Sequence, residues 1–457
     1  ARQCHGIVTH GGLSLMESDD YEEQGYFGIS IDNRHYQIPH HCPHRAGRLK
    51  HGYINTARRT ITCPLHHSVF CLETGIQLAG PPCAALDIKA QSIACGHTDS
   101  ITASPDQTAP PSTYEDSSMR YMAEQVWTPF SESVLGWDDA FHNLMLGDRL
   151  RMRAYRQAIF EMVRPGDQVI DLGTGTGILS QWSLEAGAAQ VIGIEMNAEI
   201  LQLAVSRLEQ TGHGKRFIPI NRLSYDIELD QPADVLISEI MGNLGDNENF
   251  QPILQDAIRR FLKPGGRILP LEVCSYLAPV AAVRAHQDLR TGQVKSLTPR
   301  YDVRQLYRQQ NIHSPFNLYY DCILPRSLYL AEPLLLCRYS GAWEQPATYT
   351  RELSYVLHSN GLLTGFKGYF VAQLSPHTTL DIAGDDIATG NTSDSWKHAF
   401  LPIETPVEVC RGDTLEMTFS RRYPEEDGTG FQQVYEWRGR IVRDGQTVGE
   451  FAQRTGG

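Results

Sequence analysis

The sequence predicts a multidomain protein with three parts: a small all-β domain, a central α/β domain and a carboxy-terminal antiparallel β-barrel or sandwich. Cysteine and histidine residues crowd among short strand-like stretches in the first 95 residues. Over residues 168–195, a strand-like stretch, a glycine-rich turn, a helical stretch and a second strand-like stretch follow one another, which is typical of a βαβ unit. Beyond residue 270, apolar and polar residues alternate with the period of two that strands show.

Length, charge and hydropathy exclude several classes of protein. The 457 residues suit about two to four domains. The formal net charge of −13 disfavours a general binder of nucleic acid or of anionic membranes, because both need a basic surface. No apolar run approaches the roughly 18 residues of a membrane helix, and the first residues show no signal peptide. We therefore expect a cytoplasmic protein that binds neither nucleic acid nor membrane.

The amino-terminal segment carries a pattern of metal ligands. Six of the ten cysteines lie in the first 95 residues, and two doublets stand out, Cys42-Pro-His44 and Cys63-Pro-Leu-His66, with eighteen residues between them. A local cluster of this kind, without a signal peptide, is more typical of a metal site than of disulfides. Two thiolates and two imidazoles on paired loops suit either zinc or a [2Fe–2S] cluster.

The same residues resemble a known family. The segments CPHRAGRLKHG and CPLHHSVFCLETGIQLAGPP are similar to the cluster-binding loops of Rieske ferredoxins and Rieske oxygenase domains. The resemblance implies that Cys42 and Cys63 hold one iron of a [2Fe–2S] cluster and that His44 and His66 hold the other. We place the Rieske domain at residues 1–100 and a linker rich in Pro, Ser and Thr at 101–118.

An oxygenase is the first alternative, and the sequence disfavours it. Oxygenases of this kind resemble one another in a downstream D-x2-H-x4-H iron site, which Asp139 and His142 begin, but position 147 is Gly. The α/β unit also occupies the part of the chain where the oxygenase catalytic domain would follow.

The glycine turn of the α/β part predicts a nucleotide-like ligand. A helix is expected over 149–163, where apolar residues recur at helical spacing and Pro165-Gly166 ends the run. The segment VIDLGTGTG then closes a strand, and its glycines let the backbone turn sharply and approach a ligand closely. Glu195 ends the next strand, where its carboxylate can accept both hydroxyls of a ribose. Ile178 stands where the dinucleotide fingerprint needs Gly.

Together these residues resemble class I methyltransferases, whose Rossmann-like domain binds S-adenosylmethionine. The segment FHNLMLGDRLR at 141–151 is similar to the donor-covering helix of protein arginine methyltransferases, which implies that Arg151 pairs with the donor's carboxylate and that His142 and Met145 lie over the donor. We place this domain at residues 119–270. The resemblance assigns these residues to the donor: His142, Met145, Arg151, Asp171, Gly173, Gly175, Gly177, Glu195 and Ser224.

Two glutamates predict the acceptor. The segment SEIMGNLGDNE resembles the double-glutamate loop of protein arginine methyltransferases, with Glu239 and Glu248 at that family's spacing. A guanidinium is a poor nucleophile, because it is cationic and delocalised. Two carboxylates can bind its N–H donors, localise its charge away from one nitrogen and accept its proton. We therefore predict that Glu239 and Glu248 are catalytic.

Departures from the family point to a small acceptor. The family's Thr-His-Trp loop reads Asp394-Ser395-Trp396, Ile240 replaces a tryptophan, and an aromatic pattern expected near 132–136 is missing. These changes fall around the acceptor entrance, so we expect a small guanidino compound, most simply free L-arginine. The combination is similar to arginine methylation in bacterial natural-product pathways such as nitrosourea antibiotic biosynthesis.

The resemblance to arginine methyltransferases also extends to the carboxy-terminal β-barrel, placed at 271–457. That family dimerises through an arm near the start of the barrel, and residues 295–325 suit such an arm, which implies a homodimer.

Two functional alternatives stay open. In one, the same scaffold methylates another small-molecule nitrogen, oxygen or carbon nucleophile. In the other, the protein is a Rieske redox carrier or sensor with a donor-binding module.

Overall fold

The computed structural model describes most of the chain. The described residues are 13–14, 25–31, 34–43, 49, 53–55, 59–63, 68–79, 84–92, 123–129, 145–296, 303–309, 312–341, 343–385, 393, 395–422 and 433–456. They divide into two compact units: one comprises residues 1–63, 68–78 and 82–122, and the other comprises 64–67, 79–81 and 123–457. No helix within these ranges is long and apolar enough to cross a membrane.

The amino-terminal unit is all-β in its described residues, as predicted. One sheet has the strand order β1 (Leu13–Ser14), β2 (Tyr26–Ile31), β3 (Arg34–Pro39) and β8 (Lys89–Ser92). The other has the order β4 (Tyr53–Asn55), β5 (Thr60–Thr62), β6 (Val69–Cys71) and β7 (Gln77–Ala79). Alternate apolar side chains of the strands face inward, and Ile29, Tyr36, Ile38, Ile61 and Phe70 are fully buried.

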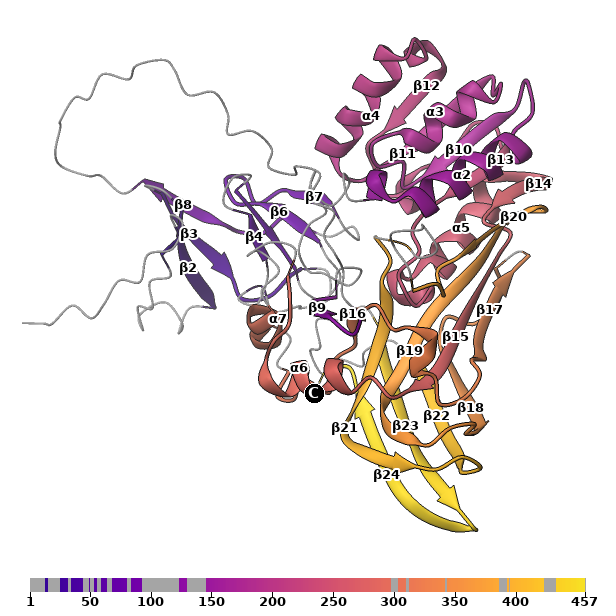
Figure 1. Cartoon of the computed structure of the whole chain (residues 1–457). Helices are drawn as coiled ribbons and strands as arrows, with labels where there is room; N and C mark the ends of the chain where they lie inside the picture. The colour runs from indigo at the N-terminus through magenta and orange to yellow at the C-terminus, as the bar shows by residue number, and fades with distance from the viewer. Residues whose placement is uncertain are drawn as a thin grey trace, which may run out of the picture. The chain divides into compact units, whose positions relative to one another are not determined.

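The second unit begins with the predicted α/β part. Five parallel strands lie in the order β12 (Phe217–Ile220), β11 (Gln190–Ile194), β10 (Gln168–Leu172), β13 (Ala233–Ser238) and β14 (Leu262–Leu269). Helices α2 (Arg149–Met162), α3 (Ile178–Glu185), α4 (Ala198–Gln210) and α5 (Phe250–Phe261) pack around this sheet (Figure 1). The strand order reverses beside β10, and in open α/β sheets ligands bind at the carboxyl ends of the strands near such a reversal.

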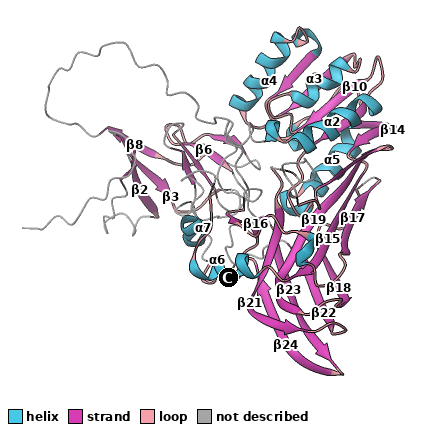
Figure 2. Ribbon diagram, in the orientation of Figure 1, coloured by secondary structure: helices cyan, strands magenta, loops and turns pink. Residues whose placement is uncertain are grey.

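The carboxy-terminal part consists of long antiparallel strands with few helices (Figure 2). One sheet has the order β17 (Leu334–Ser340), β15 (Glu272–Val280), β19 (Gly361–Ser375), β21 (His398–Val409), β16 (Tyr320–Cys322) and β9 (Val126–Trp127), and β20 (Thr378–Asp381) pairs with β19. The other has the order β18 (Tyr349–Val356), β22 (Thr414–Arg422), β23 (Val434–Arg443) and β24 (Gln446–Arg454). The turn at Asp444-Gly445 joins β23 to β24, and both residues have positive φ, as a tight hairpin needs.

The prediction of a barrel needs a correction. In the described residues the two antiparallel sheets are not hydrogen-bonded to one another into a closed barrel. They are joined instead through side chains: the rings of Phe366 on β19 and Phe451 on β24 lie 5.5 Å apart, and Trp437 on β23 donates to the carbonyl of Pro402 on β21 at 2.9 Å. An alternating pattern fixes which face of a strand is buried, and face-to-face packing satisfies that pattern as well as closure does.

The described residues of the range 295–325 belong to this part of the fold. Helices α6 (Val283–Thr291) and α7 (Val303–Gln309) contribute to a second hydrophobic core, together with β16. Its members include Val303, Leu306, Leu318 and Tyr320. Strand β16 pairs with β21 on one side and with β9 on the other.

Candidate active site

The predicted donor residues gather at one edge of the parallel sheet. Asp171 lies on β10, Glu195 directly follows β11, and Glu239 directly follows β13. Because the three strands are parallel neighbours, their carboxyl ends meet at the same edge.

The turn after β10 needs its glycines. Gly173, Gly175 and Gly177 all have positive φ, at 75°, 54° and 80°. A Cβ atom at Gly177 would also lie 2.8 Å from the Cβ atom of Ala204, which is closer than such atoms approach. The turn therefore has the positive-φ conformation that its glycines favour, at the edge of the sheet where β10 ends.

Asp171 offers an acceptor toward this edge. Its Oδ2 atom accepts hydrogen bonds from the hydroxyls of Thr174 at 2.7 Å and Ser180 at 2.6 Å. Its Oδ1 atom is buried and has no hydrogen-bond partner among the described residues. Burial raises the pKa of Asp171, and the two hydroxyls oppose that rise. A buried acceptor without a partner is costly, so this atom fits a ligand that brings a donor.

Glu195 holds the glycine turn from the neighbouring strand. Its carboxylate accepts from the backbone N–H of Gly175 at 3.1 Å and of Asn197 at 2.8 Å. Burial raises the pKa of Glu195, and these two N–H groups oppose that rise. Ser224, beyond the end of β12, is buried in the short helix Ser224–Asp226, and its carbonyl accepts from Arg260 at 2.7 Å. These residues therefore surround the carboxyl edge where a nucleoside would lie.

Arg151 and Glu239 form an ion pair at the same edge. Arg151 lies in the first turn of α2, and Asp148 caps this helix by accepting from the backbone N–H of Arg151 at 3.1 Å. The side chains of Arg151 and Glu239 are 12% and 7% exposed, so solvent screens the pair weakly. The guanidinium carbon of Arg151 also lies 4.7 Å from the centre of the Trp396 ring. The ion pair joins a residue predicted to bind the donor to a residue predicted to bind the acceptor.

Glu248 completes the cluster. It ends the short helix Asp246–Glu248, and burial raises its pKa to about 8, while the nearby charge of Arg151 opposes that rise. The structure thus brings Arg151, Glu239 and Glu248 together. In this poorly solvated place, the two carboxyl groups can bind an incoming guanidinium in place of that of Arg151, and one of them can accept a proton near neutral pH.

A serine loop meets this cluster from the antiparallel part, and the sequence did not reveal its contacts. The hydroxyls of Ser393 and Ser395 both donate to Oδ2 of Asp148, and the Ser395 N–H donates to the same atom at 3.0 Å. The indole N–H of Trp396 donates to the Met241 carbonyl at 2.7 Å. Asp148 directly before a helix is a recognisable capping signal, which could have identified it as an organising residue.

Two of the four predicted cluster ligands, Cys42 and Cys63, lie among the described residues of the amino-terminal unit. Cys42 lies three residues beyond β3 and Cys63 directly follows β5, and both are buried, at 2% and 1% exposure. The backbone N–H of Cys63 donates to the carbonyl of Ser68 at 2.8 Å. Buried thiols are compatible with the predicted role of these two cysteines as iron ligands.

Other predicted residues are placed in part. His44, His66 and His142 lie outside the described residues. Within the described ranges there is no group of three or more candidate metal ligands. Met145 is half-buried, and its carbonyl accepts from the backbone N–H of Asp148 at 3.3 Å.

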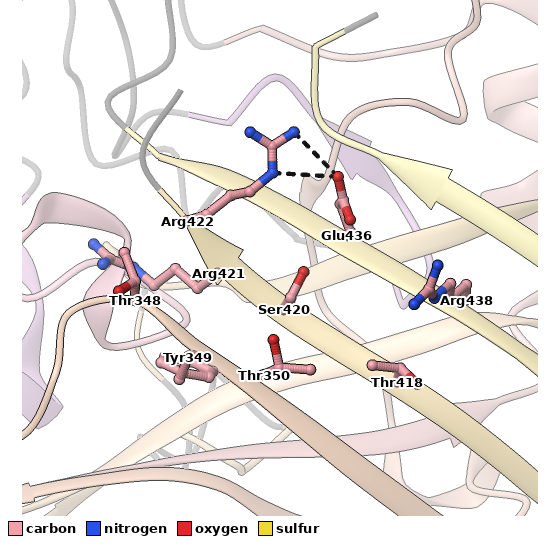
Figure 3. Close-up of a pocket in the computed structure, with 9 residues that line it drawn as sticks. All are labelled: Thr348, Tyr349, Thr350, Thr418, Ser420, Arg421, Arg422, Glu436 and Arg438. Atoms are coloured by element: carbon pink, nitrogen blue, oxygen red, sulfur yellow. Dashed lines mark hydrogen bonds and ion pairs between the residues drawn. The ribbon is translucent and has the colours of Figure 1, made fainter. Parts of the chain in front are cut away.

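A separate cavity of about 410 Å³ lies over β18, β22 and β23 (Figure 3). Hydroxyls of Thr350, Thr418 and Ser420 line it, and an ion pair between Arg422 and Glu436 lies beside them. None of the predicted site residues lines this cavity.

Family models match three parts of the chain. Three family models match: a Rieske [2Fe-2S] domain over residues 9–97, a methyltransferase domain over 164–318, and the PRMT5 oligomerisation domain over 272–444. These matches support a Rieske domain and a methyltransferase domain in this chain, and with them both predicted cofactors, S-adenosylmethionine and a [2Fe–2S] cluster.

Similar curated proteins are named as protein arginine methyltransferases. Protein arginine N-methyltransferase 5 of Xenopus laevis is 24% identical over 72% of this chain and 51% of its own length. A probable protein arginine N-methyltransferase 6 of Arabidopsis thaliana is 36% identical over 31% of this chain and 32% of its own length. The ribosomal protein arginine N-methyltransferase rmt3 of Schizosaccharomyces pombe is 25% identical over 64% of this chain and 54% of its own length. The chain therefore spans about half, or less, of these relatives.

Two solved structures share the fold. Arabidopsis thaliana protein arginine methyltransferase 10 has a TM-score of 0.57 and 20% identity, covering 69% of this chain and 96% of that one. The Trypanosoma brucei PRMT1 enzyme-prozyme heterotetrameric complex with AdoHcy has a TM-score of 0.58 and 18% identity, covering 70% of this chain and 98% of that one. These likenesses support the fold of the second unit.

Proposed function

We propose that this chain transfers a methyl group from S-adenosylmethionine to a nitrogen of a guanidino compound. The observation that carries the proposal is the cluster of Arg151, Glu239 and Glu248 at the carboxyl edge of the parallel sheet. The matches to arginine methyltransferases support the same chemistry.

On the donor side, the chain's main task is to bind and orient. Bound S-adenosylmethionine supplies an electrophilic methyl group on sulfur. Arg151 would bind the donor's carboxylate, for which the two parallel N–H donors of a guanidinium are suited. Glu195 would accept hydrogen bonds from the ribose hydroxyls, and the backbone of the glycine turn allows close approach. Alignment of this kind supplies a large share of the rate, because it converts a bimolecular encounter into a single oriented step.

On the acceptor side, Glu239 and Glu248 would bind the guanidinium from two directions. When Arg151 binds the donor's carboxylate instead of Glu239, the Glu239 carboxylate becomes available for the incoming cation. Glu248 has a pKa of about 8 before the acceptor binds, and this value suits a group that accepts a proton near neutral pH. Two carboxylates around one guanidinium also localise its charge, which leaves one nitrogen more nucleophilic.

Free L-arginine is the acceptor that we propose, because the residues that differ from the family lie at the acceptor entrance, as in Ile240 and Ser395. The resemblance to arginine methylation in nitrosourea biosynthesis supports a small molecule. Protein-bound arginine is the second candidate, and the names of the relatives favour it.

Two further assignments belong to the proposal. Cys42, His44, Cys63 and His66 would hold the [2Fe–2S] cluster, whose role is separate from methyl transfer because that reaction consumes no electrons. A homodimer is proposed from the match to an oligomerisation domain over residues 272–444.

Mass spectrometry tests the reaction directly. Protein and S-adenosylmethionine are incubated with free arginine, agmatine, lysine, or a peptide that contains arginine, and the methylated products are identified. We expect methylation of free arginine and none of lysine, whose ammonium lacks the planar fork of donors. Preference for the peptide would overturn the small-molecule assignment, and equal methylation of lysine would overturn the guanidine assignment.

Glutamine variants test the residues. Glu239→Gln and Glu248→Gln should each lower turnover by about 100-fold or more while donor affinity stays within about threefold, because the amides keep the shape but lose the charge. The double variant should be little worse than either single one, since both residues act on one group. Glu209→Gln is the matched control, because Glu209 lies exposed on α4. Full activity of Glu248→Gln would contradict the proposed role.

A further inference from the structure

Residues 242–249 form the loop that carries Glu248, called the catalytic loop below. One buried carboxylate, that of Asp246, binds this loop to the antiparallel sheets, and Asp246 is 1% exposed. Three phenolic hydroxyls donate to it: Tyr339 at 3.1 Å, Tyr349 at 2.9 Å and Tyr435 at 2.6 Å. The guanidinium of Arg421, also 1% exposed, lies 3.5 Å from the same carboxylate. These four partners come from β17, β18, β23 and β22, so both antiparallel sheets take part.

The residues around Asp246 are also held by this part of the chain, through Arg421 on β22 and through Tyr319 and Gln433, which directly precede β16 and β23. Arg421 donates to the carbonyl of Asp246 at 3.0 Å and to the side chain of Asn249 at 3.1 Å. The side chain of Asn247 donates to the hydroxyl of Tyr319 at 3.0 Å, and Gln433 donates to the carbonyl of Asn247. Residues 246, 247 and 249 are thus tied to the sheets from several directions.

Glu248 belongs to the same short turn but interacts with the α/β part. Asp246 and Glu248 are the first and last residues of the helix Asp246–Glu248, and the charge of Arg151 on α2 acts on Glu248. Because residues 246, 247 and 249 on both sides of Glu248 are held by hydrogen bonds, this short turn leaves Glu248 little freedom to move. The place of Glu248 is therefore set by what holds Asp246.

We propose that Asp246 is a positioning residue, which fixes Glu248 against Arg151 by binding three tyrosines and an arginine of the antiparallel sheets. The expected effect on turnover rests on the proposed function of Glu248, whereas the expected effect on hydrogen exchange of the loop is independent of that function.

Strand β18 offers a matched pair of variants. Tyr349 and Tyr355 both lie on β18, and they are 7% and 2% exposed. The Tyr349 hydroxyl donates to Asp246, whereas the Tyr355 hydroxyl donates to the carbonyl of Leu277 at 2.8 Å. Replacing either tyrosine by phenylalanine removes one buried hydrogen bond, so both variants should melt at a lower temperature than wild type, Tyr349→Phe somewhat more because its hydroxyl donates to a carboxylate. Only Tyr349→Phe loosens the catalytic loop.

Hydrogen exchange and kinetics on the full chain test the proposal together. In Tyr349→Phe we expect amide exchange in residues 242–249 to become several-fold faster and kcat to fall about tenfold, with donor affinity unchanged. Tyr355→Phe should leave both near wild type. Asp246→Asn should lower kcat by about 100-fold. The amide leaves Arg421 without its buried counter-charge, so this variant is also expected to be less stable. If it folds poorly, the two tyrosine variants decide the test.

The pH profile separates positioning from a general loss of stability. A looser turn admits water to Glu248, which lowers the pKa of Glu248 from about 8 toward its ordinary value. The acidic limb of kcat/KM should therefore move to lower pH in Tyr349→Phe and stay in place in Tyr355→Phe. Equal exchange rates in the two variants, or equal losses of kcat, would overturn the proposal. If the wild type methylates no guanidino compound, the proposed function fails, and the exchange rates alone then decide the role of Asp246.

Discussion

Replacing Glu248 by glutamine should make the ligand-free protein more stable at neutral pH, although it removes the proposed catalytic base. Burial raises the pKa of Glu248 from an ordinary 4.5 to about 8 in the folded chain. The folded state therefore keeps the proton through a pH range in which the unfolded state releases it. Below pH 4.5 both states hold the proton, so this group does not lower the free energy of unfolding there. As the pH rises from about 4.5 to about 8, the free energy of unfolding falls progressively, because only the unfolded state releases the proton.

The size of the effect follows from the two pKa values. With 1.36 kcal/mol for each tenfold change in proton affinity, wild type should lose about 3 kcal/mol of unfolding free energy at pH 7 relative to pH 4, through this one group. Glutamine does not titrate, so Glu248→Gln should escape this loss. The difference in stability between the variant and wild type should therefore widen as the pH rises and level off above about pH 8.

Unfolding monitored by tryptophan fluorescence checks this prediction. Melting temperatures of wild type, Glu248→Gln and the exposed control Glu209→Gln are compared at several pH values between 5 and 8.5 at constant ionic strength, without donor or acceptor. We expect the melting temperature of Glu248→Gln to exceed that of wild type by several degrees at pH 7.5 and by much less at pH 5. A difference that stays constant with pH, or that appears equally in Glu209→Gln, would refute the idea that Glu248 is a half-buried acid whose pKa is raised in the folded chain.

Further variants test the other parts of the site. Glu195→Ala should weaken S-adenosylmethionine binding by about 1–3 kcal/mol in calorimetry, because a charged hydrogen-bond partner is lost, and unaltered affinity would contradict the placement of the ribose. Arg151→Lys should also weaken donor binding, since lysine keeps the charge but loses the fork; wild-type affinity would show that Arg151 does not bind the donor's carboxylate. Ser395→Ala should lower the melting temperature of the methyltransferase unit by removing a 2.7 Å hydrogen bond to Asp148, and an unchanged value would show this contact to be unimportant. Anaerobically purified protein should contain about two irons, and Cys63→Ser should lose them and destabilise the amino-terminal unit, whereas a colourless wild type with one zinc would refute the cluster.

The α/β part was predictable because its signals are local. The strand, the glycine turn and the helix at 168–186 each depend on short-range patterns, and the glycines have the positive φ values that the pattern requires. The βαβ connection then places the ends of β10, β11 and β13 at one edge, which brings Asp171, Glu195 and Glu239 to the same place without further information.

Closure of the barrel was not predictable, because alternation is a property of single strands. Leu415, Met417 and Phe419 alternate with polar residues on β22 and are buried as expected. The pattern predicts that one face of β22 is buried, but it does not predict whether the sheet closes into a barrel or packs against a second sheet. The cluster around Asp246 could not be predicted for a related reason. The tyrosines that bind Asp246 lie about 90 to 190 residues away along the chain, and a tyrosine within a strand pattern predicts only a core side chain.

Ser395, which stands where the resemblance to arginine methyltransferases would place a histidine, still attaches its part of the chain to α2. A serine hydroxyl and its backbone N–H both donate to Asp148, so the loop stays attached to the start of α2 and Trp396 stays over Arg151. A serine does not titrate between pH 5 and 8, whereas the histidine of the resembling family would. Among the described residues of the cluster, Glu248 is the one whose pKa of about 8 suits proton acceptance at neutral pH. Ser395→His should therefore restore a second titrating group beside Asp148 and add a limb to the pH profile of kcat/KM near the ordinary histidine pKa of about 6.5. A profile unchanged by Ser395→His would mean that Glu248 alone controls proton transfer even when an imidazole is available.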